Sequence, residues 1–218
     1  MSQSSSISIS CPACGHGQEF TTWNSINVAL DPEKKTELKN GTLTRFTCEQ
    51  CGESSEVNYP ILYHDPDRKF MIWLNGDKDD SAMKSLLVGD FLNGYQLRLV
   101  ESRNHLVEKS HMFECDLDDR LMELFKATMR AAPQGVPEGE LLFAGIGTGQ
   151  NDVEELQFAV LSESETQFIG TKRSAYDDFV REFAPFLDQE PLESGMWHRV
   201  GQPYANALLA RYLPNSGE

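Results

Sequence analysis

Two Cys-x-x-Cys pairs constrain the fold of this chain more than any other feature of its sequence. They are "CPACG", with Cys11 and Cys14, and "CEQCG", with Cys48 and Cys51, and 33 residues lie between the pairs. Each pair is followed by glycine, which tolerates the tight turn that points two sulfurs at one ion. Four sulfurs complete a tetrahedral zinc sphere and leave no position open for water. The pattern therefore predicts one structural zinc ion per chain, held by these four cysteines.

A dithiol can instead carry redox chemistry, because CPxC also occurs in thioredoxin-like folds. A redox pair of that kind opens a helix after a buried strand and needs no second pair. Here "SISIS" precedes the first pair and "TLTRFT" the second, and both stretches alternate as strands do. Structural zinc is therefore the favoured interpretation, with a redox pair and free thiols as the alternatives.

Four other residues bear on metal or thiol chemistry. His16 and His64 could substitute for a cysteine ligand, but four thiolates already complete the sphere, so we interpret both as ordinary histidines. Cys115 belongs to neither pair and is interpreted as a small apolar residue, buried or half-buried. His111 lies four residues before it, which leaves a nucleophilic Cys115 as an alternative.

The charge balance bears on which partners the chain can have. The 218 residues include 19 Lys and Arg against 34 Asp and Glu, for a formal net charge of −15. Residues 1–75 hold 6 basic and 9 acidic side chains, 76–140 hold 8 and 13, and 141–218 hold 5 and 12. No third offers the positive surface that binds a phosphate backbone. Direct nucleic-acid binding is therefore disfavoured.

The expected compartment is the cytoplasm. No run of the sequence approaches the roughly 18 to 20 apolar residues of a membrane span. The opening "MSQSSSISIS" has neither the basic nor the apolar region of a signal peptide. In the cytoplasm thiols stay reduced, so paired cysteines favour metal binding over structural disulfides.

The sequence around both cysteine pairs resembles the CpXC family of bacterial and archaeal proteins, over roughly residues 7–130. The resemblance rests on Cys11, Pro12, Cys14, Gly15, Asn27, Asp31, Pro32, Cys48, Cys51, Gly52, Tyr63 and Asp65. Glu49 is a departure, because the family name leads one to expect proline there, although that side chain is not a ligand. The resemblance implies a zinc-binding N-terminal module and points to no defined activity.

The first third of the chain is predicted to be a zinc ribbon. Residues 1–6 are expected to be disordered, and the module to span 7–75, with strands on either side of each cysteine pair and a hairpin of 56–63 and 69–74. Its helical insert starts with Asp31 as N-cap and Pro32 at the first helical position, and ends at "NG" after Leu38.

Residues 76–218 are predicted to form a mixed α+β domain, with a subdomain boundary near 131–139. The text predicts a short helix near 80–88, helical sequence over 103–130 broken near 114–116, and helices starting at Ser174 and Pro203. Strands are expected at 95–102, 140–145, 155–162 and 166–171, with a short one at "WHRV" (197–200). Because helices and strands mix without a regular βαβ rhythm, the fold class is α+β.

No catalytic constellation is evident in the sequence. The glycine-rich "FAGIGTGQ" (143–150) lacks the spacing of a nucleotide loop and is interpreted as a turn or bulge. The acidic stretches 77–80, 116–119 and 152–155 lack a calcium-loop pattern and are interpreted as solvated faces or helix starts. "MWHRVGQPY" (196–204) could form a binding surface, although packing of its aromatic residues into the core is favoured.

Three functions are compatible with these observations. The leading one is a non-enzymatic protein-binding or scaffold module with a structural four-cysteine zinc site and a protein partner. The second is an enzyme with an acidic active site in residues 76–218. The third is a zinc ribbon linked to transcription, which a basic or aromatic ribbon surface would support.

Overall fold

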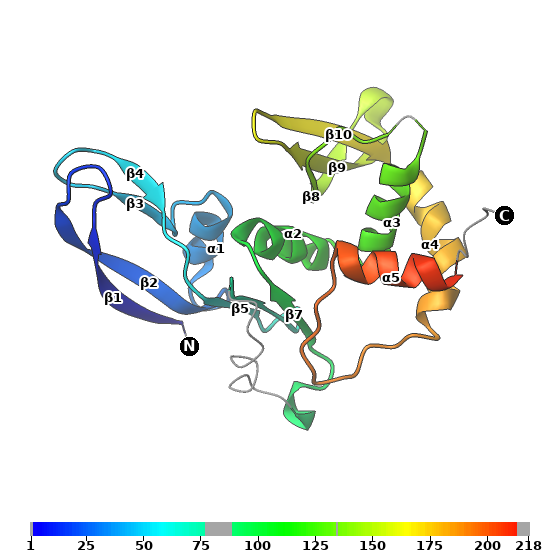
Figure 1. Cartoon of the computed structure of the whole chain (residues 1–218). Helices are drawn as coiled ribbons and strands as arrows, with labels where there is room; N and C mark the ends of the chain where they lie inside the picture. Colours follow the sequence, from blue (N-terminus) through cyan, green and yellow to red (C-terminus); the bar gives the residue numbers. More distant parts are fainter. Residues whose placement is uncertain (1, 77–88, 134, 213–218) are drawn as a thin grey trace. The chain divides into compact units, whose positions relative to one another are not determined.

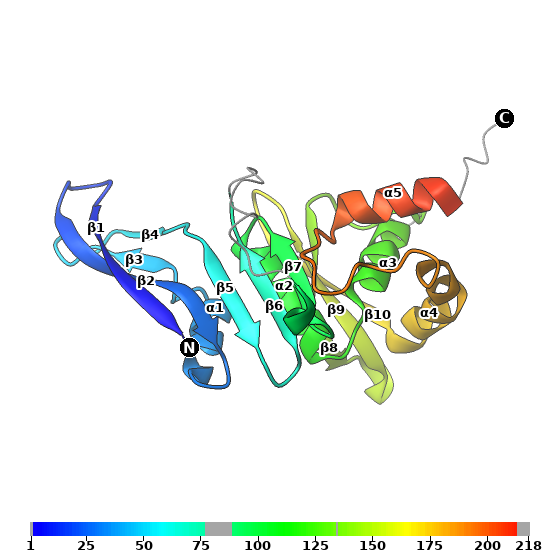
Figure 2. The same cartoon turned by 90° about the horizontal axis from the view of Figure 1, so that it is seen from below.

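The structure is a computed structural model that describes residues 2–76, 89–133 and 135–212 (Figures 1 and 2). It divides into two compact units, Met1–Val107 with Ser194–Trp197, and Glu108–Glu193 with His198–Glu218. The described residues contain five α-helices and ten strands. The mixture confirms the predicted α+β class.

A five-stranded sheet forms the centre of the first unit. Its order is β1 (Gln3–Ser10), β2 (Gly17–Asn27), β5 (Ile61–Asp65), β6 (Phe70–Leu74) and β7 (Gln96–Val100). The β1–β2 and β5–β6 pairs are antiparallel, whereas β2–β5 and β6–β7 are parallel. The sheet is therefore mixed, with β1 at one of its edges.

The hairpin of β5 and β6 buries one face, as the period of two in its sequence requires. Buried and half-buried residues alternate along both strands. On the buried face, the rings of Tyr63 and Phe70 stack with their centroids 5.9 Å apart. The turn between the strands is closed by Asp65, whose carboxylate accepts a hydrogen bond from the backbone N–H of Arg68 at 3.0 Å. This is the hairpin that the sequence predicts around "HDPDRK", although its first strand begins at Ile61 and not at residue 56.

The N-terminal residues are part of the sheet. The sequence predicts disorder over residues 1–6, but β1 begins at Gln3 and pairs with β2 along its whole length. Side chains reinforce the ladder, since Ser6 donates to the Glu19 carboxylate at 2.5 Å and Thr22 donates to the Ser5 carbonyl at 3.3 Å.

A helix and a small hairpin are inserted between β2 and β5. Helix α1 (Pro32–Lys39) starts at proline and ends just before Gly41, whose φ of +79° suits glycine. The Asp31 side chain makes no capping bond. The strands β3 (Arg45–Thr47) and β4 (Ser54–Glu56) pair antiparallel.

Arg103, the first residue of α2 (Arg103–Glu114), ties this insert together. Its guanidinium donates to the Leu38 carbonyl of α1 at 3.2 Å and contacts the Glu56 carboxylate of β4 at 2.9 Å. A cation at the end of a helix also satisfies carbonyls that have no partner within the helix. The division between the two units falls inside α2, after Val107.

The segment between β6 and β7 is described only in part. The helix predicted near 80–88 lies outside the described residues, and a short 3-10 turn, η2 (Asp90–Leu92), follows it. Buried Trp197 packs with Leu92, Leu97 and Leu99, in agreement with the core role favoured for this aromatic residue. A single bridge residue stands at the predicted strand 197–200.

The second unit combines three helices with a three-stranded antiparallel sheet. Its elements are α3 (Asp119–Ala131), β8 (Glu140–Thr148), the 3-10 turn η3 (Gln150–Asp152), β9 (Glu154–Leu161), β10 (Thr166–Lys172), α4 (Arg173–Leu187) and α5 (Gln202–Tyr212). The sheet order is β10-β9-β8, and α3 packs against both α4 and α5 (Figure 1). Phe125 of α3 lies at the centre of the core, with its ring 5.3 Å from Tyr176 and 5.2 Å from Phe179.

Two local predictions from the sequence can be compared with the structure of this unit. The glycine-rich stretch after Phe143 is a strand with a bulge, because the β8–β9 register shifts between Phe143 and Gly145, where φ is +146°. Helix α4 starts at Arg173, one residue before the predicted Ser174, and its N-cap is Lys172.

Candidate metal centre

The first cysteine pair lies on a tight turn between β1 and β2, here called the first knuckle (residues 11–16). The N–H of Cys11 donates to the His16 carbonyl at 2.8 Å, and the N–H of Gly15 donates to the Cys11 carbonyl at 2.9 Å. Gly15 has a φ of +75°, a conformation that costs other residues about 1–2 kcal/mol.

The second cysteine pair lies between β3 and β4, on the second knuckle (residues 48–53). The N–H of Cys48 donates to the Glu53 carbonyl at 2.8 Å, and the N–H of Gly52 donates to the Cys48 carbonyl at 2.9 Å. The φ of Gly52 is also +75°. The two knuckles therefore have the same backbone hydrogen bonds, although their residues other than cysteine and glycine differ.

The two knuckles bring four sulfurs together. All four Sγ atoms lie within 4.8 Å of one another, and both the Cys11–Cys51 and the Cys14–Cys48 separations are 3.6 Å. A tetrahedral ion with ligands at ~2.3 Å would hold its sulfurs about 3.8 Å apart. The two short distances are equivalent, because each joins the first cysteine of one knuckle to the second cysteine of the other. The four thiols can therefore hold a single ion of the size of zinc.

The site is buried on one side and exposed to solvent on the other. Cys11 and Cys48 are buried and pack with Phe46, and Ile9 and Phe20 pack against them. The second cysteine of each knuckle is exposed. The apolar wall excludes water from the buried sulfurs, which strengthens their electrostatic interaction with a cation.

Backbone donors tune the acidity of the buried Cys48 thiol. Burial by itself would raise its pKa, but hydrogen bonds from the backbone of Cys51 and Gln50, together with those from the Cys51 and Cys14 thiols, outweigh that effect and lower the pKa from 9.0 to about 6. For Cys51, a backbone hydrogen bond involving Glu53 lowers the pKa, while the Cys14 thiol and burial raise it, with a net rise to about 12. The cluster thus favours one thiolate first, and a cation must displace the protons of the others.

Gln18 joins the two knuckles and was not among the predicted site residues. Its side-chain Nε2 donates to the Thr47 carbonyl at 3.1 Å, and its Oε1 accepts from the backbone N–H of Glu49 at 2.8 Å. A proline at position 49, as the family name suggests, would have no N–H to donate. Because residue 49 is glutamate and not proline, its backbone N–H can donate this hydrogen bond to Gln18. The sequence offers no signal for this contact beyond the position of Gln18 four residues after Cys14.

The remaining candidates are not members of the four-sulfur group. His16 contributes its backbone carbonyl to the first knuckle. His64 lies on β5, where its Nε2 is 3.4 Å from the Tyr95 hydroxyl and burial lowers its pKa. Cys115 is half-buried against the core of the second unit. Among the described residues, the four cysteines are the one group of His, Cys, Asp and Glu that could hold a metal ion.

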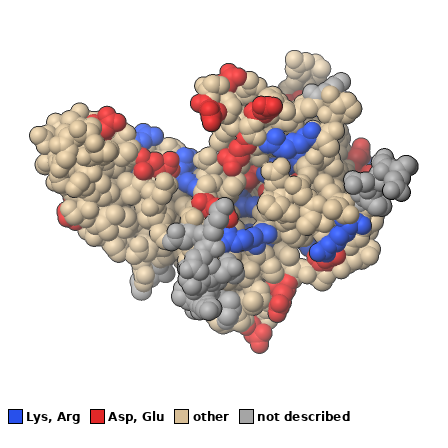
Figure 3. All heavy atoms as spheres, in the orientation of Figure 1, with Lys and Arg blue, Asp and Glu red and all other residues tan. Residues whose placement is uncertain are grey.

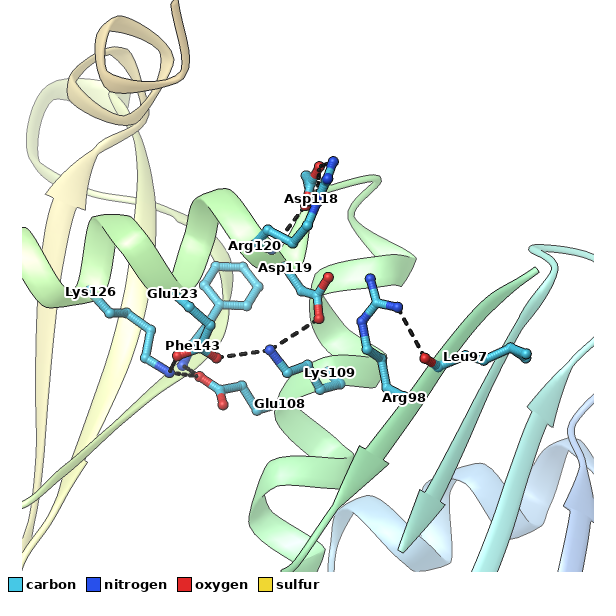
Figure 4. Close-up of polar contacts among 10 residues, drawn as sticks. All are labelled: Leu97, Arg98, Glu108, Lys109, Asp118, Asp119, Arg120, Glu123, Lys126 and Phe143. Carbon is cyan, nitrogen blue, oxygen red and sulfur yellow. Dashed lines mark hydrogen bonds and ion pairs between the residues drawn. The ribbon is translucent and has the colours of Figure 1, made fainter. Parts of the chain in front are cut away.

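The second unit contains a buried charge cluster that the sequence did not reveal (Figure 4). Its members are Glu108 and Lys109 of α2 and Asp119, Glu123 and Lys126 of α3, none more than 8% exposed. Of the three acidic stretches noted in the sequence, only 116–119 contributes a residue, and 77–80 lies outside the described residues.

Ion pairs connect all five members of the buried charge cluster. The Nζ of Lys109 lies 2.8 Å from Glu123 and 3.2 Å from Asp119, and the Nζ of Lys126 lies 2.7 Å from Glu108 and 3.1 Å from Glu123. The cluster holds three carboxylates and two ammonium groups, so its formal charge is −1 when all are ionised.

The pKa shifts follow from this arrangement. Burial raises the pKa of Glu108, and neighbouring Lys126 opposes that rise only in part. Burial would also raise the pKa of Glu123, but Lys109 and Lys126 outweigh it and lower the pKa. Glu108 is also bound to the sheet, since its Oε1 accepts from the backbone N–H of Phe143 at 2.7 Å. These contacts join α2, α3 and β8 within the second unit.

The comparison with protein families decides the affiliation of the chain. The family model described as CpXC protein matches residues 9–126, more than half of the chain. The chain belongs to the CpXC family. The match covers both knuckles and all five members of the buried charge cluster, and it ends inside α3.

Other comparisons add no relative. No curated protein and no solved structure matches the chain. None of the described helices has the length and apolar character that crossing a membrane demands.

Proposed function

We propose that this CpXC chain is a non-enzymatic protein-binding or scaffold module of the cytoplasm, folded around one structural zinc ion. The observation that carries the proposal is the closed set of four sulfurs, all within 4.8 Å of one another. A catalytic zinc has three protein ligands and an open position for water or substrate, whereas four thiolates leave none open. Cys11, Cys14, Cys48 and Cys51 are the proposed ligands.

The ion would act as a cross-link. The knuckles come from two separate hairpins, β1–β2 and β3–β4, and the small apolar cluster at their junction holds few buried side chains. A structural zinc site supplies folding free energy directly in such a small module. The role of the metal here is to stabilise the fold, and its removal would unfold the ribbon.

One observation favours the enzyme alternative. Carboxylates do converge in the second unit, namely Glu108, Asp119 and Glu123. However, each is at most 4% exposed and is paired with a lysine, so these carboxylates present almost no surface to solvent or to a substrate. Buried, paired charges of this kind support a structural role.

Exposed apolar side chains support a protein partner. Leu30 and Phe91 in the first unit and Phe168 in the second are each at least 60% exposed. Exposed apolar side chains that gather into a patch mark protein interfaces, so these three are candidates for contacts with a partner. The formal net charge of −15 opposes binding to nucleic acid, which disfavours the transcription-linked alternative.

The zinc proposal is tested on the full chain purified without added metal. Elemental analysis should find one zinc per chain, and Cys48→Ser should lower the zinc content and melt the ribbon. Cys115→Ser is the matched control, because this half-buried thiol packs against the core of the other unit, and it should retain full zinc. A Cys48→Ser variant with wild-type zinc content and melting would refute the proposal.

The protein-binding role needs its own test. Leu30→Ser and Phe91→Ser alter exposed residues outside the sulfur site, so both should keep the zinc and the melting temperature. Capture of a partner by the wild-type chain, with loss of capture by one of these variants, would support the role. Equal capture by both variants and the wild type would contradict the use of this surface.

A further inference from the structure

We propose that the outer edge of β1 is an interface through which two copies of this chain pair as antiparallel strands. β1 is the terminal strand of the five-stranded sheet, and its ladder partner among the described residues is β2. Seven of its eight residues are exposed. Figures 1 and 2 show β1 at the end of the sheet, and no described strand pairs with its other side, so its second row of backbone N–H and C=O groups is available for pairing.

This edge lacks the features that usually prevent pairing. Exposed edge strands are normally blocked by charged side chains, proline, bulges or a covering element. The sequence of β1, "QSSSISIS", contains no charge and no proline, and its one register shift is at the start, between Gln3 and Ser4. The edge strand β8 differs, because the Glu108 carboxylate covers the N–H of Phe143.

The charge distribution favours a second copy as the occupant. The chain has a formal net charge of −15, but residues 1–75 hold only 6 basic and 9 acidic side chains. The face over β1 and β2 is mostly free of charged side chains in Figure 3. Two copies can therefore meet at β1 with little repulsion, whereas a charged peptide would find no opposite charge on this strand.

The sequence of β1 also suggests the register. Ile7 is 40% exposed and lies opposite Phe20 of β2. Antiparallel pairing centred on Ile7 places it opposite the partner's Ile7, and places Ser5 opposite the partner's Ile9. The two isoleucines then continue the apolar row that Phe20 begins, and cross-strand pairs of this kind stabilise sheets. The interface is isologous, with the same strand contributed by both copies.

The register makes a specific test available, because residue 7 faces itself across the interface. Sedimentation of the zinc-loaded full chain at micromolar concentrations should give a species of twice its 24.5 kDa mass. Ile7→Lys alone and Ile7→Glu alone should each raise the dimer dissociation constant at least about tenfold, since like charges then lie directly opposite. An equimolar mixture of the two variants should recover dimers, because Lys then faces Glu. Phe168→Lys, on an edge strand of the other unit, is the control and should dimerise as the wild type does.

Hydrogen exchange supplies a second measurement that needs no variant. Amide protection within residues 3–10 should rise as the wild-type concentration increases, while protection in β10 should not change. Thermal melts of both Ile7 variants should match the wild type at concentrations low enough for all three to be monomeric, because this side chain is 40% exposed in the single chain. A wild-type chain that stays monomeric, or a variant mixture that fails to dimerise while the wild type does, would overturn the proposal.

Discussion

Gly15 and Gly52 have the same backbone conformation, with φ at +75° in both, and each donates its N–H to the carbonyl of the first cysteine of its knuckle. Beyond the adjacent residues, no atom lies within 4 Å of the place that a β-carbon would take at either glycine. Glycine is therefore required at these positions by the backbone angle, and not by a lack of space for a side chain. Because the two knuckles are equivalent, the angle is a property of the turn that presents the sulfurs.

This equivalence predicts the effect of adding one methyl group. Gly52→Ala should lower the free energy of unfolding of the first unit by about 1–2 kcal/mol, the cost of a left-handed conformation for a residue with a β-carbon. Gly17→Ala is the matched control, since Gly17 has equal space and no positive φ. Denaturant unfolding in excess zinc measures both variants. An equal loss in both would show that the backbone angle is not the cause.

A second prediction concerns the hydrogen bond between Gln18 and the backbone of Glu49. Glu49→Pro should be accommodated by the turn, because Pro12 occupies the equivalent place in the first knuckle. It removes the N–H that donates a hydrogen bond to Gln18, so we expect the free energy of unfolding to fall by about 1 kcal/mol. Glu49→Ala keeps the N–H and should be neutral.

The double variant separates the hydrogen bond from other effects of proline. In the Gln18→Ala background, Glu49→Pro should cost less than it does alone, by a coupling free energy of about 1 kcal/mol. Simple additivity of the two changes would show that the hydrogen bond contributes nothing. Urea unfolding of the four proteins completes the cycle.

Local features of the fold could be predicted from sequence, because each has a short-range cause. Pro32 and Gly41 bound α1 through their own backbone preferences, and the β5–β6 hairpin follows from a period of two with turn residues between the strands. The α+β class follows from the same local patterns. The family affiliation also rests on short stretches around the cysteines, and the matched range 9–126 agrees with it.

Long-range contacts could not be predicted in this way. Gln18 and Glu49 are 31 positions apart, and nothing in either local sequence marks the bond between them. The buried charge cluster is a similar case, because Lys109 and Glu123 read as ordinary polar residues of two helical stretches. Only the angle at which α2 and α3 meet brings their charges together. The serine content of residues 1–6 predicts disorder, whereas pairing with β2 orders the backbone from Gln3 onward.

Breaking the buried charge cluster should be costly. Lys126→Met leaves the carboxylates of Glu108 and Glu123 without one of their cations, and the loss of one partner from a buried ion pair costs about 3–5 kcal/mol. Lys172→Met removes the same charge from an exposed position and should change stability by less than about 0.5 kcal/mol. Thermal denaturation of the second unit compares them. Similar melting of the two variants would contradict the burial of these charges.

The pH dependence of the cluster follows from the opposite shifts of two carboxyl groups. Glu108 has a raised pKa because of burial, so its contribution to stability is fully present below the unfolded pKa and is lost as pH rises through the folded pKa. Glu123 has a lowered pKa because the two lysines outweigh its burial, so its contribution is present above the unfolded pKa and is lost as pH falls through the folded pKa.

Glu108→Gln isolates the first of these effects. The amide keeps an oxygen for the N–H of Phe143, and the four remaining charges of the cluster sum to zero. Relative to the wild type, the variant should therefore gain stability as pH rises from the acidic range through the folded pKa of Glu108. Glu165→Gln removes the same charge at an exposed position and is the control. Urea unfolding of the second unit across this pH range provides the measurement, and a stability difference independent of pH would show that folding does not shift the pKa of Glu108.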